Sequence, residues 1–227
     1  MKILMIGSDP KLSAECIKQG FRLVTEADYD KSTKVFLSSF DRSAVKYADV
    51  CPNVDRQLRW HSTYNQFLGL KGKLPLVPYS FEKEYSSIAK ELGNSFSLVF
   101  QVSGMTDVVR NIGYQLDFAT ATKEHNGEPY IAIAPNSSAS YRMYCIRNRI
   151  LGCFSIDDKG NEQTAPRGTT QGLIDACKTI CAVTGLQYYS ADFVRGTNEE
   201  FLLKHIDTCP NSSRYASKIV DKVVRHL

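Results

Sequence analysis

The stretch GLQYYSADFVRGTNEEFLLKHIDTCP, residues 185–210, decides the fold of this 227-residue chain. It contains two runs rich in aromatic and aliphatic residues, Leu186–Val194 and Phe201–Asp207, separated by residues that favour turns. Two such runs with a short polar connection predict an antiparallel hairpin. We expect the hairpin to close at Thr197–Glu200.

The predicted hairpin brings charged and titratable side chains to one face. Because side chains alternate along a strand, closure at that turn pairs Val194 with Leu203 and Asp192 with His205, and Asp207 follows along the same face. Two carboxylates and an imidazole are suitable ligands for a divalent cation. The pattern by itself favours an ordinary cross-strand ion pair at a sheet surface, and a slip of one residue would separate the three side chains.

The first part of the chain predicts a small parallel α/β unit, because short apolar strands alternate with a capped helix. The turn Gly7-Ser8-Asp9-Pro10 can cap the helix, and Gly20 ends it. The expected elements are strands at Lys2–Ile6, Phe21–Val24 and Lys34–Leu37 and a helix at Leu12–Gln19.

The middle of the chain predicts helices and further strands. In the strand over 96–102, Leu98 and Phe100 share one face while Val99 and Gln101 share the other. The expected elements are one helix at Asp55–Leu70, an extended segment at Leu74–Pro78, a helix at Glu84–Leu92 ended by Gly93, and strands at Phe96–Val102 and Tyr130–Ala134.

The last third predicts a second hairpin before the first one described. Its strands are Tyr141–Ile146 and Ile150–Ile156, joined by Arg147-Asn148-Arg149. Residues 157–169 are polar and rich in turn formers, so we expect an exposed loop. After it we expect a helix at Gln171–Thr184 ended by Gly185, and a C-terminal helix with an apolar stripe at Ile219, Val220, Val223 and Val224.

Composition excludes several classes of protein. The net charge of +4 is mild and its basic residues are scattered, so it permits an anionic partner without indicating nucleic acid. The seven cysteines show no zinc-type spacing, which indicates free thiols in a reducing compartment. No apolar run approaches the roughly 20 residues that span a bilayer. We therefore expect a cytoplasmic protein without a membrane partner.

At the acidic hairpin the sequence resembles the ATP-grasp superfamily. Members carry an aspartate on one strand and "E-hydrophobic-N-x-x-P" on the next, and these acidic and amide side chains bind the magnesium of Mg-ATP. Here Asp192 matches the aspartate and Pro210 the proline. His205 stands at the glutamate position and Asp207 at the asparagine position. The resemblance thus implies a metal site at Asp192, His205 and Asp207.

Other segments follow in the order of the family. Ser140–Ile146 with Arg149–Gly152 resembles the "D-x-R-V-x-V" hairpin, and Arg142 matches the arginine that approaches the triphosphate. Phe96–Gln101 resembles the strand whose lysine contacts phosphates, and Gln101 stands at that lysine. The remaining matches are Gly104 in the family's glycine-rich loop, Tyr130 and Ile131 at the adenine-contacting hinge, and Leu58–Pro78 at the entry to the nucleotide-binding subdomain.

The resemblance implies a fold and a division of the chain. The expected fold is α+β or α/β: a short pre-grasp α/β domain followed by two α+β subdomains that sandwich a nucleotide. The expected boundaries are 1–54 for the pre-grasp domain, 55–134 for the N-terminal subdomain and 135–227 for the C-terminal subdomain.

The resemblance also implies an activity. It is an ATP-dependent ligase that joins a carboxylate to an amine through an acylphosphate, with ATP and Mg²⁺ as cofactors. Arg142 and Arg167 would be catalytic, and Gln101, Gly104, Tyr130, Ile131 and Arg142 would contact the nucleotide. Substrates would be small-molecule or peptide acids and amines, and a homodimer is possible.

Departures from the family pattern leave a second interpretation open. Gln101 replaces a cation by a neutral amide, whose hydrogen bonds to phosphate are roughly half as strong. His205 shifts the metal preference from Mg²⁺ toward Mn²⁺ or Zn²⁺. The alternative is a non-catalytic relative that serves as a nucleotide-binding or protein-interaction module. A nucleic-acid partner, suggested only by the basic turn 147–149, is the weakest hypothesis.

Overall fold

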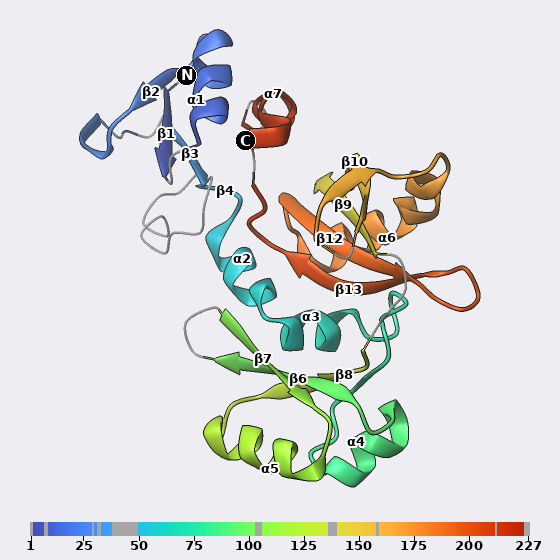
Figure 1. Cartoon of the computed structure of the whole chain (residues 1–227). Helices are drawn as coiled ribbons and strands as arrows, with labels where there is room; N and C mark the ends of the chain where they lie inside the picture. The colour runs from blue at the N-terminus through green and yellow to red at the C-terminus, as the bar shows by residue number, and fades with distance from the viewer. Residues whose placement is uncertain are drawn as a thin grey trace.

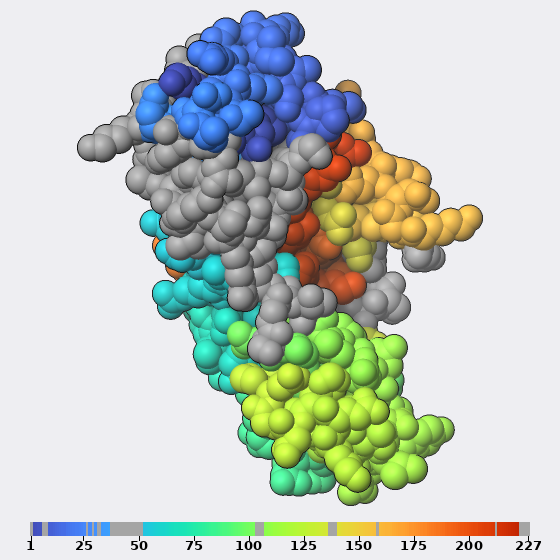
Figure 2. Space-filling view, turned by 90° about the vertical axis from the view of Figure 1, so that its left-hand side faces the viewer, coloured from blue at the N-terminus to red at the C-terminus, as the bar shows by residue number. Residues whose placement is uncertain are grey.

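The computed structural model describes residues 2–6, 9–28, 30, 33–37, 50–102, 106–135, 140–157, 159–211 and 213–224. They form three β-sheets, each with its own helices, in the order of the chain (Figure 1). In the space-filling view the N-terminal unit lies at the top and the lobe of the central sheet at the bottom (Figure 2).

The N-terminal unit is the predicted parallel α/β unit. Its sheet has the order β2-β1-β3-β4, with every pairing parallel. The side chain of Asp9 accepts a hydrogen bond from Leu12 N at 3.0 Å and begins α1, while Gly20, at φ +80°, follows its end. Gly7 and Ser8 of the predicted turn lie outside the described residues. The elements are β1 (Lys2–Ile6), α1 (Pro10–Lys18), β2 (Arg22–Val24), a 3-10 turn (Glu26–Asp28), β3 (Thr33–Leu37) and β4 (Val50–Cys51).

The central sheet is antiparallel, in the order β5-β8-β6-β7. Phe96, Leu98 and Phe100 face the helices α4 and α5, and Val99 faces the other side, as the alternation predicts. The elements are β5 (Tyr79–Ser80), α4 (Tyr85–Leu92), β6 (Phe96–Val102), β7 (Thr106–Ile112), α5 (Gln115–Glu124) and β8 (Tyr130–Ile133).

Two elements of this lobe are missing from the sequence-based prediction. β7 alternates weakly because it is an edge strand whose Val109 is 53% exposed. α5 buries only Phe118 and Ala121, while Leu116 is 76% exposed. Apolar periodicity is therefore weak in both, and periodicity is the main signal by which sequence reveals such elements.

The third sheet has the order β11-β10-β9-β12-β13, and α6 covers one of its faces. The prediction that 157–169 is only an exposed loop is wrong, because Glu162–Thr164 pair with β10 as a short edge strand. The elements are β9 (Ser140–Ile146), β10 (Arg149–Ile156), β11 (Glu162–Thr164), α6 (Thr169–Thr184), β12 (Tyr188–Arg195) and β13 (Phe201–Asp207).

The predicted single helix at 55–70 is two helices, α2 (Val54–His61) and α3 (Thr63–Leu70). Ser62 breaks it with extended backbone, at φ −70° and ψ 130°. The hydroxyl of Ser62 does not cap α3. Instead the carboxylate of Asp107, on β7, accepts a hydrogen bond from Thr63 N at 2.8 Å. A cap that comes from a distant strand leaves no local sequence signal.

The C-terminal segment returns to the N-terminal unit, where it contacts α1 (Figure 1). Ile219 and Val220 are fully buried in one cluster with Ile3 and Leu12. The predicted apolar stripe is thus confirmed in its first half, and the side chains of Val223 and Val224 lie outside those described. The elements are a 3-10 turn (Ser213–Tyr215), α7 (Ala216–Ile219) and a π-helical turn (Val220–Val224).

A buried glutamine joins α3 to the third sheet. Gln66 is fully buried, and its Oε1 accepts a hydrogen bond from Ile206 N at 2.8 Å while its Nε2 donates to Ile206 O at 2.7 Å. The side-chain amide thereby pairs with the outer edge of β13 as a neighbouring strand would. Further along this edge, Leu203 exchanges backbone hydrogen bonds with Pro75 and Val77.

The described helices include none that is both long and apolar enough to cross a membrane. The division of the chain at residues 54 and 134 stays a prediction. The three sheets follow that order, although α7 packs in one cluster with residues of both the first unit and the third sheet.

Gln66→Leu should lower the free energy of unfolding by about 2–4 kcal/mol, because Ile206 N and Ile206 O would remain buried without partners. Urea denaturation measures the change. Gln115→Leu, at the exposed start of α5, is the matched control and should change stability by less than about 0.5 kcal/mol. A loss for Gln66→Leu as small as that of the control would contradict the role given to this side chain.

Candidate functional site

The terminal hairpin has the predicted pairing at one position and a different one beyond it. Asp192 lies opposite His205, as predicted. The prediction that Val194 pairs with Leu203 is wrong, because Val194 pairs with Leu202. The register shifts after Asp192, which leaves Lys204 as the extra residue of a β-bulge.

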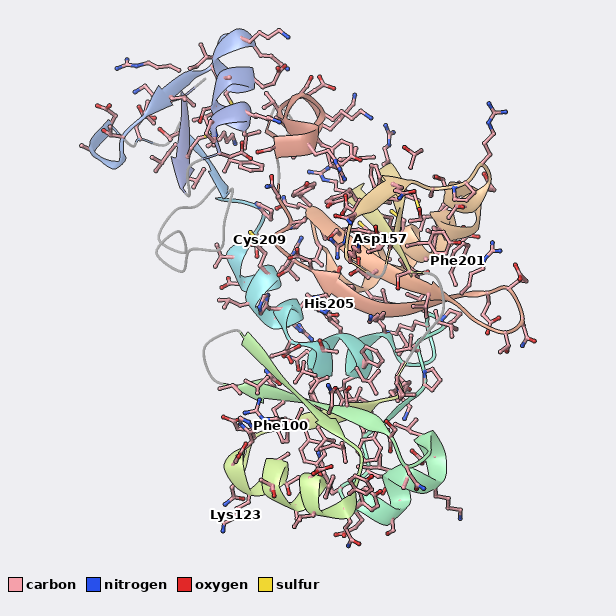
Figure 3. All side chains as sticks on the ribbon, viewed as in Figure 1. Phe100, Lys123, Asp157, Phe201, His205 and Cys209 are labelled. Carbon is pink, nitrogen blue, oxygen red and sulfur yellow. The ribbon has the colours of Figure 1, made fainter. Side chains whose placement is uncertain are left out.

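The bulge turns two successive side chains to the same face. Leu203 and Ile206 are both fully buried in the cluster under α6. Lys204 and His205, between them, both line a cavity on the opposite face. Figure 3 shows His205 on the side of β13 that faces α3 and the central sheet.

This cavity, which we call the inter-sheet cleft, has a volume of about 340 Å³, within the range of small-ligand sites. Its walls come from the start of α3, Val77, β6, β7, the end of β8 with the two residues after it, and β13. Most of the lining is apolar, and the polar side chains gather at Thr63, Asp107, Lys204 and His205. The full lining is Thr63, Val77, Ser97, Val99, Asp107, Val109, Ile133, Ala134, Pro135, Lys204 and His205.

Tyr130 and Ile131, which the resemblance places at the adenine-contacting hinge, do not line the inter-sheet cleft. Tyr130 points to the opposite face of the sheet, where its ring lies 5.2 Å from that of Phe100 and its hydroxyl donates to Lys83 O. Ile131 is fully buried behind Val99 and does not line the cleft. Ile133, Ala134 and Pro135 do so instead.

Gln101 shares the face of Val99 and lies directly opposite Asp107 in the β6–β7 pair. Its side chain is half-buried and is not part of the lining of the cleft. Gly104 lies outside the described residues. Arg167 is exposed just before α6, and no ion pair holds it among the described residues.

Arg142 and Asp192 form a two-pronged ion pair between β9 and β12. The Nε and Nη2 of Arg142 donate to the two carboxylate oxygens of Asp192 at 2.7 and 2.8 Å. The hydrogen bonds to Asp192 raise the pKa of Arg142 above its ordinary value, against the opposing effect of burial. Arg142 and Asp192 both stand at positions that resemble family positions in the sequence. In the structure they lie directly opposite one another in the β9–β12 pair.

Glu162, on the unpredicted strand β11, extends this ion pair. Its carboxylate accepts hydrogen bonds from Arg142 Nη1 at 3.2 Å, from Tyr144 Oη at 2.8 Å and from Arg214. Burial acts to raise the pKa of Glu162, but the bonds from Tyr144 and Arg214 outweigh it and hold the pKa below its ordinary value. Glu162 also lines a second cavity of about 520 Å³, together with Lys11, Tyr144, Asn211, Ser213 and Arg214.

Burial lowers the pKa of His205 below its ordinary value, against the attraction of Asp192, Asp207 and Asp107. Its Nδ1 lies 3.3 Å from Thr63 Oγ1. Asp207 Oδ1 accepts a hydrogen bond from Cys209 N at 2.9 Å. The predicted ligands thus lie along one region of the hairpin, but within the described residues no three His, Cys, Asp or Glu side chains converge as a group that could hold a metal.

Comparison with known proteins finds structural relatives only. No family model and no curated protein sequence matches the chain. The ATP-grasp ligase PsnB, complexed with a minimal precursor, superposes with a TM-score of 0.70 at 10% identity, over 100% of this chain and 99% of that one. The RimK domain ATP-grasp protein from Sphaerobacter thermophilus gives 0.71 at 12% identity, over 99% and 100%. D-cycloserine synthetase DcsG gives 0.71 at 11% identity, over 100% and 99%.

The chain therefore has the ATP-grasp fold over its whole length, which confirms the fold that the sequence motifs implied. At these identities the likeness establishes the fold and not the reaction. The inter-sheet cleft lies between the central and third sheets, which are the two α+β subdomains of the predicted fold.

Glu162→Gln should lower the free energy of unfolding at pH 7 and make that free energy less dependent on pH in the acidic range. Since the pKa of Glu162 is depressed in the folded protein, its stabilising effect is complete above the unfolded pKa of about 4.5 and is lost as the pH falls through the folded value. Denaturant titrations from pH 7 to pH 3 should show the gap between wild type and variant closing below about pH 4.5. Glu91→Gln, on the exposed side of α4, is the control. A gap that is constant with pH would contradict the assignment.

Proposed function

We propose that the inter-sheet cleft binds ATP and that the chain is an ATP-dependent ligase joining a carboxylate to an amine through an acylphosphate. The observation that carries this proposal is the cleft itself: a largely apolar slot between two sheets that is also lined by Asp107, Lys204 and His205. Apolar walls suit a nucleobase, and the polar side chains suit phosphates.

Structural relatives support the choice of reaction. One structure of PsnB, an ATP-grasp ligase, is complexed with Mg and ADP, and DcsG is a D-cycloserine synthetase. A ligase of this kind transfers the terminal phosphoryl group of ATP to a carboxylate, and an amine then displaces phosphate. A homodimer stays a prediction.

Asp192, His205 and Asp207 are the side chains we propose for the metal. Mg²⁺ in nucleotide sites is commonly held by one or two carboxylates together with substrate phosphates, so a cage of three protein ligands is not required. Asp207 keeps its Oδ2 for such a role, and His205 its Nε2, while Asp192 would share its carboxylate with Arg142. A bound Mg²⁺ or Mn²⁺ would neutralise charge on the phosphates.

Arg142 would act between the nucleotide and the acid, although it lines neither cavity. Its guanidinium bonds Asp192, which lies opposite the cleft residue His205, and also Glu162, which lines the second cavity. That cavity offers Lys11 and Arg214 to a carboxylate group. Arg142 would thus orient the transferred phosphoryl group beside the acid that receives it. Arg167 stays a predicted acceptor-side residue.

The alternative is a non-catalytic relative that binds a nucleotide or a protein. Two observations favour it: Gln101 is neutral at the position of the family lysine, and Asp107, an acid, lies directly opposite. Arg142 and Asp192 also satisfy one another without any ligand.

Thermal unfolding in the presence of nucleotide tests whether the chain binds ATP, as both the ligase and a nucleotide-binding relative would. ATP at 100 times its dissociation constant, with Mg²⁺ or Mn²⁺, should stabilise the fold by about 2.7 kcal/mol. A ligase should then release ADP with a suitable acid and amine, and the alternative should bind without release. The absence of any stabilisation by ATP with either metal would contradict nucleotide binding.

Asp207→Ala should abolish ADP release if this carboxylate holds the metal. Because Asp207 also bonds Cys209 N, circular dichroism must show that the variant is folded. Asp175→Asn, on a carboxylate exposed on α6, is the matched control and should keep wild-type turnover. Unchanged turnover in Asp207→Ala would remove this residue from the metal site.

A further inference from the structure

Lys204 has an unusual position for a lysine on an otherwise alternating strand. Between Leu203 and Ile206, which are both fully buried under α6, two residues must share the opposite face. The bulge achieves this at the loss of one paired position in the β12–β13 ladder. Its consequence is that Lys204 and the neighbouring His205 both line the inter-sheet cleft.

Lys204 carries the positive charge of this cleft. Among the lining residues it is the lone lysine or arginine. It is exposed and forms no ion pair within the part of the chain that the structure describes, whereas Lys2 pairs with Asp30 and Lys178 with Asp175. A cation that faces an apolar cleft without a counter-ion is suited to an anionic ligand.

The remaining polar groups of the cleft do not offer a second cation. Asp107 is negative and caps α3 through Thr63 N. Thr63 and Ser97 are uncharged. An anion that enters the cleft therefore meets one lysine or arginine, and that residue comes from β13 rather than from β6.

We propose that Lys204, turned into the cleft by the β-bulge, is the residue that binds the phosphates of the nucleotide by a charge-assisted hydrogen bond. This inference rests on the proposed nucleotide binding and assigns its phosphate specificity to one side chain. An ammonium group donates such bonds as a point charge, and they contribute more than neutral ones. The contact acts on the phosphates and leaves the apolar contacts of the base unchanged.

The test compares nucleotides that differ only in phosphate. Isothermal titration at fixed ionic strength measures the binding of adenosine, ADP and ATP, with Mg²⁺, to the full chain. Lys204→Gln should weaken ATP and ADP about 10- to 100-fold, the effect of losing a hydrogen bond to a charged group. It should leave adenosine within about threefold, and Lys204→Arg should keep ATP within about threefold. Lys90→Gln, on the exposed side of α4, is the matched control and should bind all three ligands as wild type does.

The outcomes separate this inference from the function on which it rests. If wild type and Lys204→Gln bind ATP equally well, that result overturns the role of Lys204 and leaves nucleotide binding intact. Equal weakening of adenosine and ATP would show that Lys204 acts on the shape of the cleft, and would also overturn the proposal. Wild type that binds no ATP overturns both. If Lys204→Gln fails to fold, Lys204→Met gives the same charge removal and is compared in its place.

Discussion

The pairing of the Gln66 side chain with Ile206 is the interaction on which the arrangement of the central and third sheets depends. A carboxamide presents a donor and an acceptor side by side, as a peptide group does, so it can complete the edge of a strand. Gln66 uses both on one residue of β13. Because α3 also contacts β6 and β8, this edge contact connects the third sheet to the central one and gives the inter-sheet cleft its opposite walls.

The charged side chains of the candidate site are arranged in two groups with different characters. Arg142, Asp192, Glu162 and Arg214 neutralise one another in a chain of ion pairs across β9, β11 and β12. Such partly buried pairs fix geometry more than they add stability. Lys204, by contrast, has no ion-pair partner among the described residues. The ion-paired residues therefore hold one another in place without a ligand, whereas Lys204 carries a charge that an anionic ligand would neutralise.

The sequence predicts this fold well where local chemistry decides the structure, and less well where distant groups do. The pairing of Asp192 with His205 follows from strand alternation and a short turn, and the N-terminal unit follows from the cap at Asp9 and Gly20. The break at Ser62 is not predictable locally, since α3 is capped by Asp107 from another sheet. The bulge at Lys204 cannot be predicted from strict alternation of side chains along a strand. The same holds for its effect, which is that Lys204 and His205 both face the cleft.

The return of the C-terminal segment to the N-terminal unit has a consequence for the order in which the chain folds during synthesis. Ile3 and Leu12 lie in one buried cluster with Ile219 and Val220. A ribosome makes the first pair early and the second only after all the intervening chain has emerged, and domains commonly fold in that order. This first unit cannot complete its core while the two later units are being made. Part of its apolar surface therefore stays exposed until Ile219 and Val220 have been synthesised. The earliest segment of the chain is thus among the last whose core is completed.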